Sequence, residues 1–210
     1  VREILRIPEG NLYTTQPVTQ RREPNNYEWQ KRHRDILSLN QSNPPRRVIL
    51  GNSITHFWGG EPKGPSVRGM ETWEKIMRPA GFHNLGYGFD RIENVLWRVY
   101  HGELDGYKAE EVVLMIGTNN IGINNDNEIV EGIRFLLSAI KQRQPEAKIK
   151  VIGIPPQPRR TGKESQSPHP SNGRDRMVHV QEPGYEVASG RRQDKRILIL
   201  RRITPERGRL

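Results

Sequence analysis

Short hydrophobic runs alternate with amphipathic stretches through the middle of the chain. Four runs end near Gly or Asn, as buried strands do: 48–50, 82–85, 112–116 and 149–154. Between them, residues 91–100 and 127–142 place their apolar side chains on one face at helical spacing. This alternation predicts an α/β fold, in which a parallel sheet is covered by helices on both faces.

The two ends of the chain have a different pattern. The first 40 residues are polar and contain Pro8, Pro17 and Pro24, which favours an extended arm followed by a helix over 29–39. The end of the chain is rich in Ser, Pro, Gly and Arg, and its one convincing apolar stretch is 197–200. We therefore expect three parts: an arm with a first helix (1–40), a core (41–156) and an anomalous basic tail of low order with at most one strand (157–210).

The formal charge of +10 over 210 residues suggests a polyanion partner, but the charge is unevenly distributed. Residues 1–156 carry 21 basic and 18 acidic side chains, whereas residues 157–210 carry 13 and 6. All four Trp and all four Phe precede residue 157, so no aromatic platform accompanies the basic tail. We expect solvated charges there rather than a nucleic-acid interface, and keep a polyanion binder as a third alternative.

Composition excludes several other classes of protein. The chain has no Cys, which rules out disulfides and thiolate metal sites, and it has no apolar run of about 18 residues that would span a membrane. It starts at Val1 without a signal segment, so we expect a mature or trimmed form. No metal or organic cofactor is expected.

Three strand ends carry Ser, Gly and Asn, at the sheet edge where open α/β sheets bind ligands. Ser53 follows the first strand, Gly86 closes the second and Asn119 follows the third. Each has an ordinary alternative: Ser53 is a suitable helix cap, Gly86 a turn glycine and Asn119 a turn residue.

Taken together, these positions resemble blocks I, II and III of the SGNH (GDSL-type) hydrolase family, particularly the catalytic subunits of the platelet-activating-factor acetylhydrolases. The resemblance covers residues 46–156 and rests on five segments: Gly51-Asn52-Ser53, Asn84-Leu85-Gly86, 95–98 with 102–104, Gly117-Thr118-Asn119-Asn120 and 143–149. It implies a flavodoxin-like, three-layer α/β/α fold.

The resemblance also implies roles for these residues. Ser53 would be the nucleophile, and the N–H groups of Ser53 and Gly86 would form an oxyanion hole with the Asn119 amide. The family usually has Asp where this chain has Asn52, which we interpret as a subfamily trait. A small acyl ester of a carbohydrate or lipid is the expected substrate, a homodimer is an option, and secretion or the periplasm is favoured over the cytoplasm.

The general base of such enzymes comes from a C-terminal Asp-x-x-His block, which this sequence lacks. Asp175 and His179 are four residues apart instead of three, and His56 is better explained as a packing or surface residue. We hypothesise that the tail is a frameshifted translation, because with suitable codons a forward shift of one nucleotide lets residues 201–209 encode Asp-Gly-Leu-His-Pro-Asn-Glu-Ala-Gly. The coding DNA tests this idea.

The sequence thus favours a serine esterase or acetylhydrolase that acts through an acyl-serine intermediate. The alternative is a catalytically silent relative that binds esters or carbohydrates without turnover.

Overall fold

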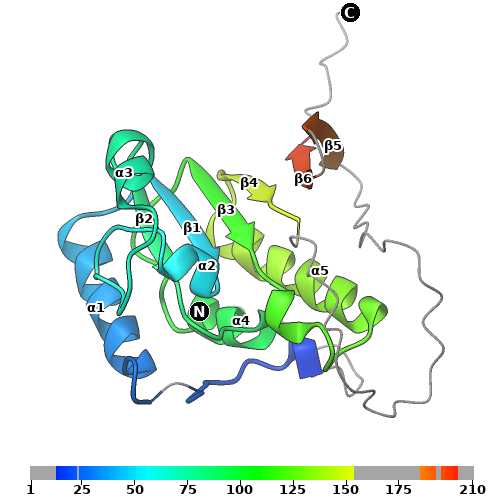
Figure 1. Cartoon of the computed structure of the whole chain (residues 1–210), viewed down its shortest axis with the longest axis horizontal. Coiled ribbons are helices and arrows are strands. Elements are labelled where there is room, and N and C mark those ends of the chain that lie inside the picture. Colours follow the sequence, from blue (N-terminus) through cyan, green and yellow to red (C-terminus); the bar gives the residue numbers. More distant parts are fainter. Residues whose placement is uncertain (1–12, 23, 154–184, 193–194, 203–210) are drawn as a thin grey trace, which may run out of the picture.

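The computed structural model describes residues 13–22, 24–153, 185–192 and 195–202 (Figure 1). Its main sheet is parallel and has the strand order β2-β1-β3-β4. The strands are β1 (Arg47–Gly51), β2 (Phe82–Gly86), β3 (Glu111–Met115) and β4 (Lys148–Val151). This order is that of the first four strands of a flavodoxin-like sheet, so the predicted α/β fold is confirmed.

Helices cover both faces of this sheet. The helical elements are η1 (Tyr13–Thr15), α1 (Trp29–Ser42), α2 (Ser53–His56), α3 (Met70–Thr72), the π-helical turn η2 (Trp73–Met77), α4 (Ile92–Tyr100), η3 (Thr118–Asn120) and α5 (Asp126–Arg143). Helices α1, α4 and α5 bury their apolar faces against one side of the sheet, in a cluster that includes Leu50, Leu85 and Leu114. On the other side, Trp73 and Met77 pack on Ile49 and Val113. Successive side chains along a strand point to opposite faces of the sheet, so the strands contribute residues to both clusters.

The register of the strands brings their carboxyl ends to one edge. Gly51 at the end of β1 pairs with Gly86 of β2 on one side and with Met115 of β3 on the other. The segments that follow β1, β2 and β3 therefore begin side by side, as the sequence predicts for a parallel sheet.

A buried polar network fixes α4 beneath the end of β2. The guanidinium of Arg98 is fully buried, with Nε 2.9 Å from Asp90 Oδ2 and Nη1 bonded to Glu103. Glu103 also accepts hydrogen bonds from the Tyr87 hydroxyl and from His33. Burial raises the pKa of Asp90 to about 6, and the neighbouring Arg98 opposes this shift. Breaking such a network leaves an unpaired buried charge, which is costly.

The N-terminal arm is more closely packed than the sequence suggests. The Thr14 hydroxyl donates to the Glu128 carbonyl at 2.8 Å, and Thr14 lies so close to Gly132 that a Cβ there would be 2.5 Å from the threonine Cβ. Residues 13–22 are thus seated against α5 and the end of β2, which no periodicity in this polar segment could predict.

The helix expected over 29–39 is confirmed as α1, although it continues to Ser42. The helical turns α3 and η2 were not predicted, because their apolar residues do not repeat over enough turns. In the tail, the expected strand at 197–200 lies within β6 (Lys195–Arg202), which pairs antiparallel with β5 (Tyr185–Arg192). The tail therefore contains two strands where we expected one.

Candidate functional site

Ser53 is the first residue of α2 and lies directly beyond the end of β1. The Asn52 side chain caps this helix by accepting the N–H of Ile54 at 3.0 Å, so Ser53 itself is not the capping residue. Asn52 is buried, whereas Ser53 is half-buried. Among the described residues, neither the hydroxyl nor the backbone N–H of Ser53 has a hydrogen-bond partner. Both groups are therefore free to meet a ligand.

The backbone N–H of Gly86, a predicted oxyanion donor, already has an acceptor. It donates to Asn84 Oδ1 at 2.9 Å, and the Asn84 amide in turn donates to the carbonyls of Thr55 and Gly59. A Cβ at Gly86 would lie 2.3 Å from the backbone nitrogen of His56. Glycine is required here because α2 packs directly on the strand end. The proposed donor role of Gly86 stays a prediction, and would require Asn84 to release this N–H.

Phe89, in the loop after β2, was not singled out by the sequence. It is the only non-glycine residue in the described part of the chain with a positive φ, 63°. This left-handed conformation is uncommon for a bulky residue and costs energy that the surroundings must supply. Within the described residues its backbone N–H has no acceptor. A lone phenylalanine in a Gly-rich loop gives no sequence signal for this geometry.

Asn119 lies in η3, beyond the end of β3, and its amide reaches the loop after β2. Asn119 Nδ2 donates to the carbonyl of Asp90 at 2.9 Å, which uses one of its two amide hydrogens. Its neighbour Asn120 is fully buried and instead bonds to Ile92 N–H and to Glu93. Asn119 is thus half-buried at the candidate site, whereas Asn120 is a buried structural residue.

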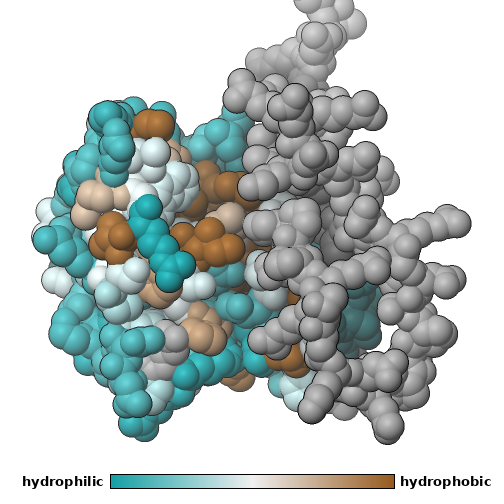
Figure 2. Space-filling view, in the orientation of Figure 1, coloured by the Kyte–Doolittle hydropathy of each residue, from teal (hydrophilic) through white to brown (hydrophobic). Residues whose placement is uncertain are grey.

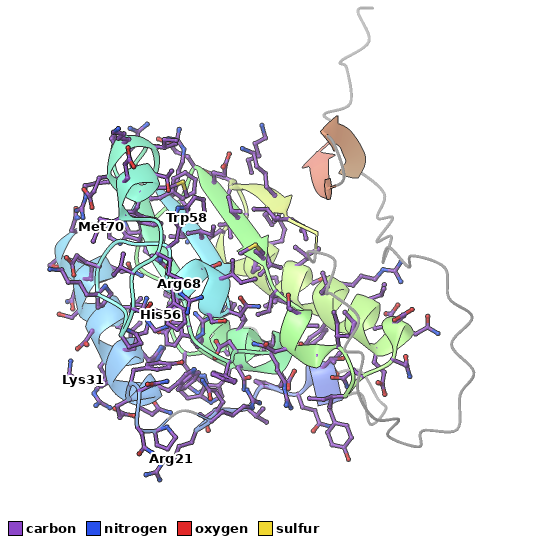
Figure 3. The ribbon with its side chains drawn as sticks, in the orientation of Figure 1. Arg21, Lys31, His56, Trp58, Arg68 and Met70 are labelled. Carbon is purple, nitrogen blue, oxygen red and sulfur yellow. The ribbon has the colours of Figure 1, made fainter. Side chains whose placement is uncertain are left out.

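His56 is a buried packing residue, which is one of the two interpretations that the sequence left open. Its Nδ1 accepts the N–H of Gly88 at 3.0 Å, and its Nε2 has no partner among the described residues. Burial lowers the pKa of His56 to about 2, and the nearby Arg32 and Arg98 act in the same direction. A neutral ring whose Nδ1 is already occupied is unsuited to deprotonating Ser53. Figure 3 shows His56 at the end of α2, with Arg68 nearby and Trp58 farther toward α3.

The other described histidines are engaged away from Ser53. His33 bonds to Glu103, His83 bonds to Asn40, and His101 stacks on Trp97. Asp175 and His179, like most of the segment assigned to a frameshift, lie outside the described residues. No group of three metal-ligating side chains occurs in the part of the chain that the structure describes. None of its helices is long and apolar enough to cross a membrane.

Large apolar side chains are exposed in the segments that follow three neighbouring strands. Ile54 follows β1, Phe89 follows β2, and Ile121 and Ile123 follow β3, with exposed fractions of 47%, 42%, 49% and 58%. Figure 2 shows apolar residues near the middle of the face on which α2 lies. We call these four residues the apolar rim. Exposed apolar groups at a candidate ligand-binding edge of a sheet favour an apolar ligand.

The chain is similar in sequence to curated proteins and similar in fold to a solved structure. The chain is 27% identical over 151 residues to human platelet-activating factor acetylhydrolase IB subunit alpha1, a match that covers 72% of this chain and 58% of that protein. It is 30% identical over 128 residues to the alpha2 subunit from Rattus norvegicus, covering 61% of this chain and 52% of the relative. The chain thus spans little more than half the length of these relatives.

A solved structure from Streptococcus pneumonia, designated a candidate platelet activating factor, has the same fold. Its TM-score is 0.50 at 20% identity, and the match covers 63% of this chain and 57% of the other. The model of the GDSL-like Lipase/Acylhydrolase family matches residues 49–183, which includes Ser53, Gly86 and Asn119 and extends beyond residue 156 into the tail. The match covers more than half of the sequence. The chain therefore belongs to the GDSL-like lipase/acylhydrolase family.

Proposed function

We propose that this protein hydrolyses short-chain acyl esters through an acyl intermediate on Ser53. The observation that carries the proposal is the unpartnered hydroxyl of Ser53, flanked at the neighbouring strand ends by N–H donors that are held in place. The family supports ester hydrolysis in general, and the names of the curated relatives support an acetyl ester as substrate.

The reaction begins when the Ser53 oxygen attacks the ester carbonyl carbon. The carbonyl π electrons move to its oxygen, and collapse of this oxyanion expels the alcohol with a proton and leaves an acyl-serine. Water then attacks the acyl-serine and releases the carboxylic acid and the free serine. No metal or organic cofactor is needed for either step.

The oxyanion needs hydrogen-bond donors that are oriented before the reaction. We assign this role to the backbone N–H of Ser53, the second amide hydrogen of Asn119 and the unpartnered N–H of Phe89. Phe89 replaces Gly86 in our proposal because the N–H of Gly86 donates to Asn84. Removing one such donor typically lowers the rate by about 100- to 1,000-fold.

The general base is the one component that the described residues do not supply. We expect slow Ser53-dependent turnover from the chain as written, in which solvent water takes the proton of the Ser53 hydroxyl, and faster turnover from a chain whose coding frame restores an Asp-x-x-His block.

The apolar rim favours a lipid or aryl alcohol over a carbohydrate as the leaving group. Ile121 and Ile123 present no hydrogen-bonding groups to sugar hydroxyls, and apolar surface gains free energy when a ligand removes it from water. An acetylated lipid alcohol therefore fits this surface better than an acetylated sugar.

Hydrolysis of p-nitrophenyl acetate by the full chain and by Ser53→Ala tests the proposed function. We expect release of p-nitrophenol above the uncatalysed rate, and its loss in the variant. Mass spectrometry of the rapidly quenched reaction should show an acetyl group on Ser53. Equal rates for the two proteins would leave only an ester-binding role.

A further inference from the structure

The carbonyl oxygen of Gly88 is held by two side chains from the N-terminal arm. The Tyr27 hydroxyl donates to it at 2.6 Å, and Gln20 Nε2 donates to it at 2.9 Å. Gln20 Nε2 also lies 3.1 Å from the Tyr27 hydroxyl, so the two side chains support each other. Gln20 is buried although it belongs to a polar segment, which indicates a specific role for its amide.

Holding this carbonyl also fixes the N–H of Phe89. The two groups belong to one planar trans peptide, in which C=O and N–H point in opposite directions. With the Gly88 oxygen held by Tyr27 and Gln20, the Phe89 N–H is directed away from the arm. It has no acceptor among the described residues, so the clamp presents a free donor of defined direction.

The peptides on either side of this one are also restrained. The N–H of Gly88 donates to His56 Nδ1 at 3.0 Å, and the carbonyl of Phe89 accepts Arg22 Nη1 at 2.7 Å. These contacts give the left-handed φ of Phe89 the external support that such a conformation requires. Gln20, Arg22 and Tyr27 therefore maintain the loop after β2 in an otherwise unfavourable conformation.

We propose that Gln20 and Tyr27 are positioning residues for ester hydrolysis, which act by fixing the Phe89 N–H as an oxyanion donor. This inference rests on the proposed function. A donor that bonds to the oxyanion more strongly than to the neutral ester stabilises the transition state. If the Phe89 N–H loses its fixed direction, kcat should therefore fall while KM stays nearly unchanged.

Tyr27→Phe tests the clamp with little change in packing, because the ring is retained. We expect kcat for p-nitrophenyl acetate to fall by about tenfold, with KM within about twofold. The matched control is Tyr107→Phe, which removes a hydroxyl that donates to the Glu103 carbonyl at 2.8 Å, far from Ser53 in the loop before β3. Tyr107→Phe should have the same kcat as the original chain. Gln20→Met should lower kcat by a similar factor to Tyr27→Phe. In the double variant, kcat should fall by less than the product of the two separate factors.

A second measurement follows the peptide group itself. The chain has four phenylalanines, so ¹⁵N-phenylalanine labelling of the full protein gives four amide signals, and Phe89→Leu identifies the one from residue 89. Tyr27→Phe and Tyr107→Phe each add a fifth signal, from the substituted position. A hydrogen bond to a carbonyl polarises the N–H of the same peptide. We therefore expect Tyr27→Phe, and not Tyr107→Phe, to move this signal and to speed its exchange with deuterium.

The outcomes separate the clamp from the proposed function. An unchanged Phe89 signal in Tyr27→Phe overturns the clamp, and a moved signal with unchanged kcat overturns its role in hydrolysis. Equal hydrolysis by the full chain and by Ser53→Ala overturns the proposed function and the catalytic role together, while the Phe89 signal still decides whether the clamp exists.

Discussion

The side-chain amide of Asn119 donates to the main-chain carbonyl of Asp90 at 2.9 Å, which ties the loop after β3 to the loop after β2. Strand β1, which ends just before Ser53, lies between β2 and β3, so the bond links the loops on the two sides of that strand. Asp90 is itself anchored by Arg98 and Trp29 in the core. The orientation of a half-buried amide at the site thus depends on buried charges beneath it.

Asn119 and Asn120 should separate activity from stability. We expect Asn119→Ala to lower kcat about 100-fold with little change in the free energy of unfolding, because it removes an oxyanion donor. Asn120→Ala should lower the free energy of unfolding by about 2 kcal/mol, because it leaves buried partners such as Glu93 unsatisfied. Ester hydrolysis and urea unfolding of both variants check this division. Similar losses of stability in the two would contradict it.

His56 should make the protein less stable in acid. Its pKa falls from 6.5 to about 2 on folding, so the unfolded chain binds a proton that the folded chain excludes, and stability is lost as pH falls below 6.5. Between pH 7.5 and pH 5 the loss is about 2 kcal/mol. Asp90 acts in the opposite direction, because its pKa is raised to about 6 and its folded state takes up a proton in this range.

A comparison with His56→Gln isolates this effect, since all other groups titrate equally in both proteins. Glutamine can still accept the N–H of Gly88 but does not titrate. The free energy of unfolding of the original chain minus that of the variant should therefore decrease by about 2 kcal/mol from pH 7.5 to pH 5 in urea titrations. A difference that does not change with pH would mean that His56 is not protected from protonation.

The apolar rim should contribute to substrate binding. Ile121→Ser should raise KM for p-nitrophenyl acetate severalfold and leave kcat nearly unchanged, because it removes apolar contact made equally in the ground and transition states. Ile76→Ser is the matched control: Ile76 is 63% exposed, but it lies in η2, which precedes β2. Equal KM values for the two variants would show that the rim does not contact the substrate.

Asn52→Asp introduces the residue usual in the family. Asn and Asp are equally good helix caps, so we expect the N–H of Ile54 to stay bonded and the free energy of unfolding to change by less than about 1 kcal/mol. The rate of ester hydrolysis should stay within about threefold, since Asn52 does not contact the ester in our proposal. Asn125→Asp, at the cap of α5, is the control for the substitution itself. A gain of about 100-fold in Asn52→Asp would instead identify Asn52 as the reason for weak activity.

Much of the fold could be predicted because its signals are local. The runs 48–50 and 112–116, which became β1 and β3, are apolar over their whole length, and α4 and α5 repeat their apolar residues at helical spacing. The helical turns α3 and η2 and the seating of residues 13–22 were missed, since they depend on contacts with residues far away in the sequence. Thr14, for example, is buried by its contacts with α5.

For the candidate site, the sequence by itself determined which residue types stand at the strand ends: Ser53, Gly86 and Asn119, at an edge that any parallel sheet must form. Only the tertiary structure decided which of their groups are free. In the structure, the N–H of Gly86 donates to the Asn84 side chain, whereas Phe89 adopts a left-handed conformation and its N–H has no partner among the described residues. The positions of strands and helices follow from the local hydrophobic pattern, whereas the direction of one N–H depends on hydrogen bonds from residues more than 60 positions away, such as Tyr27.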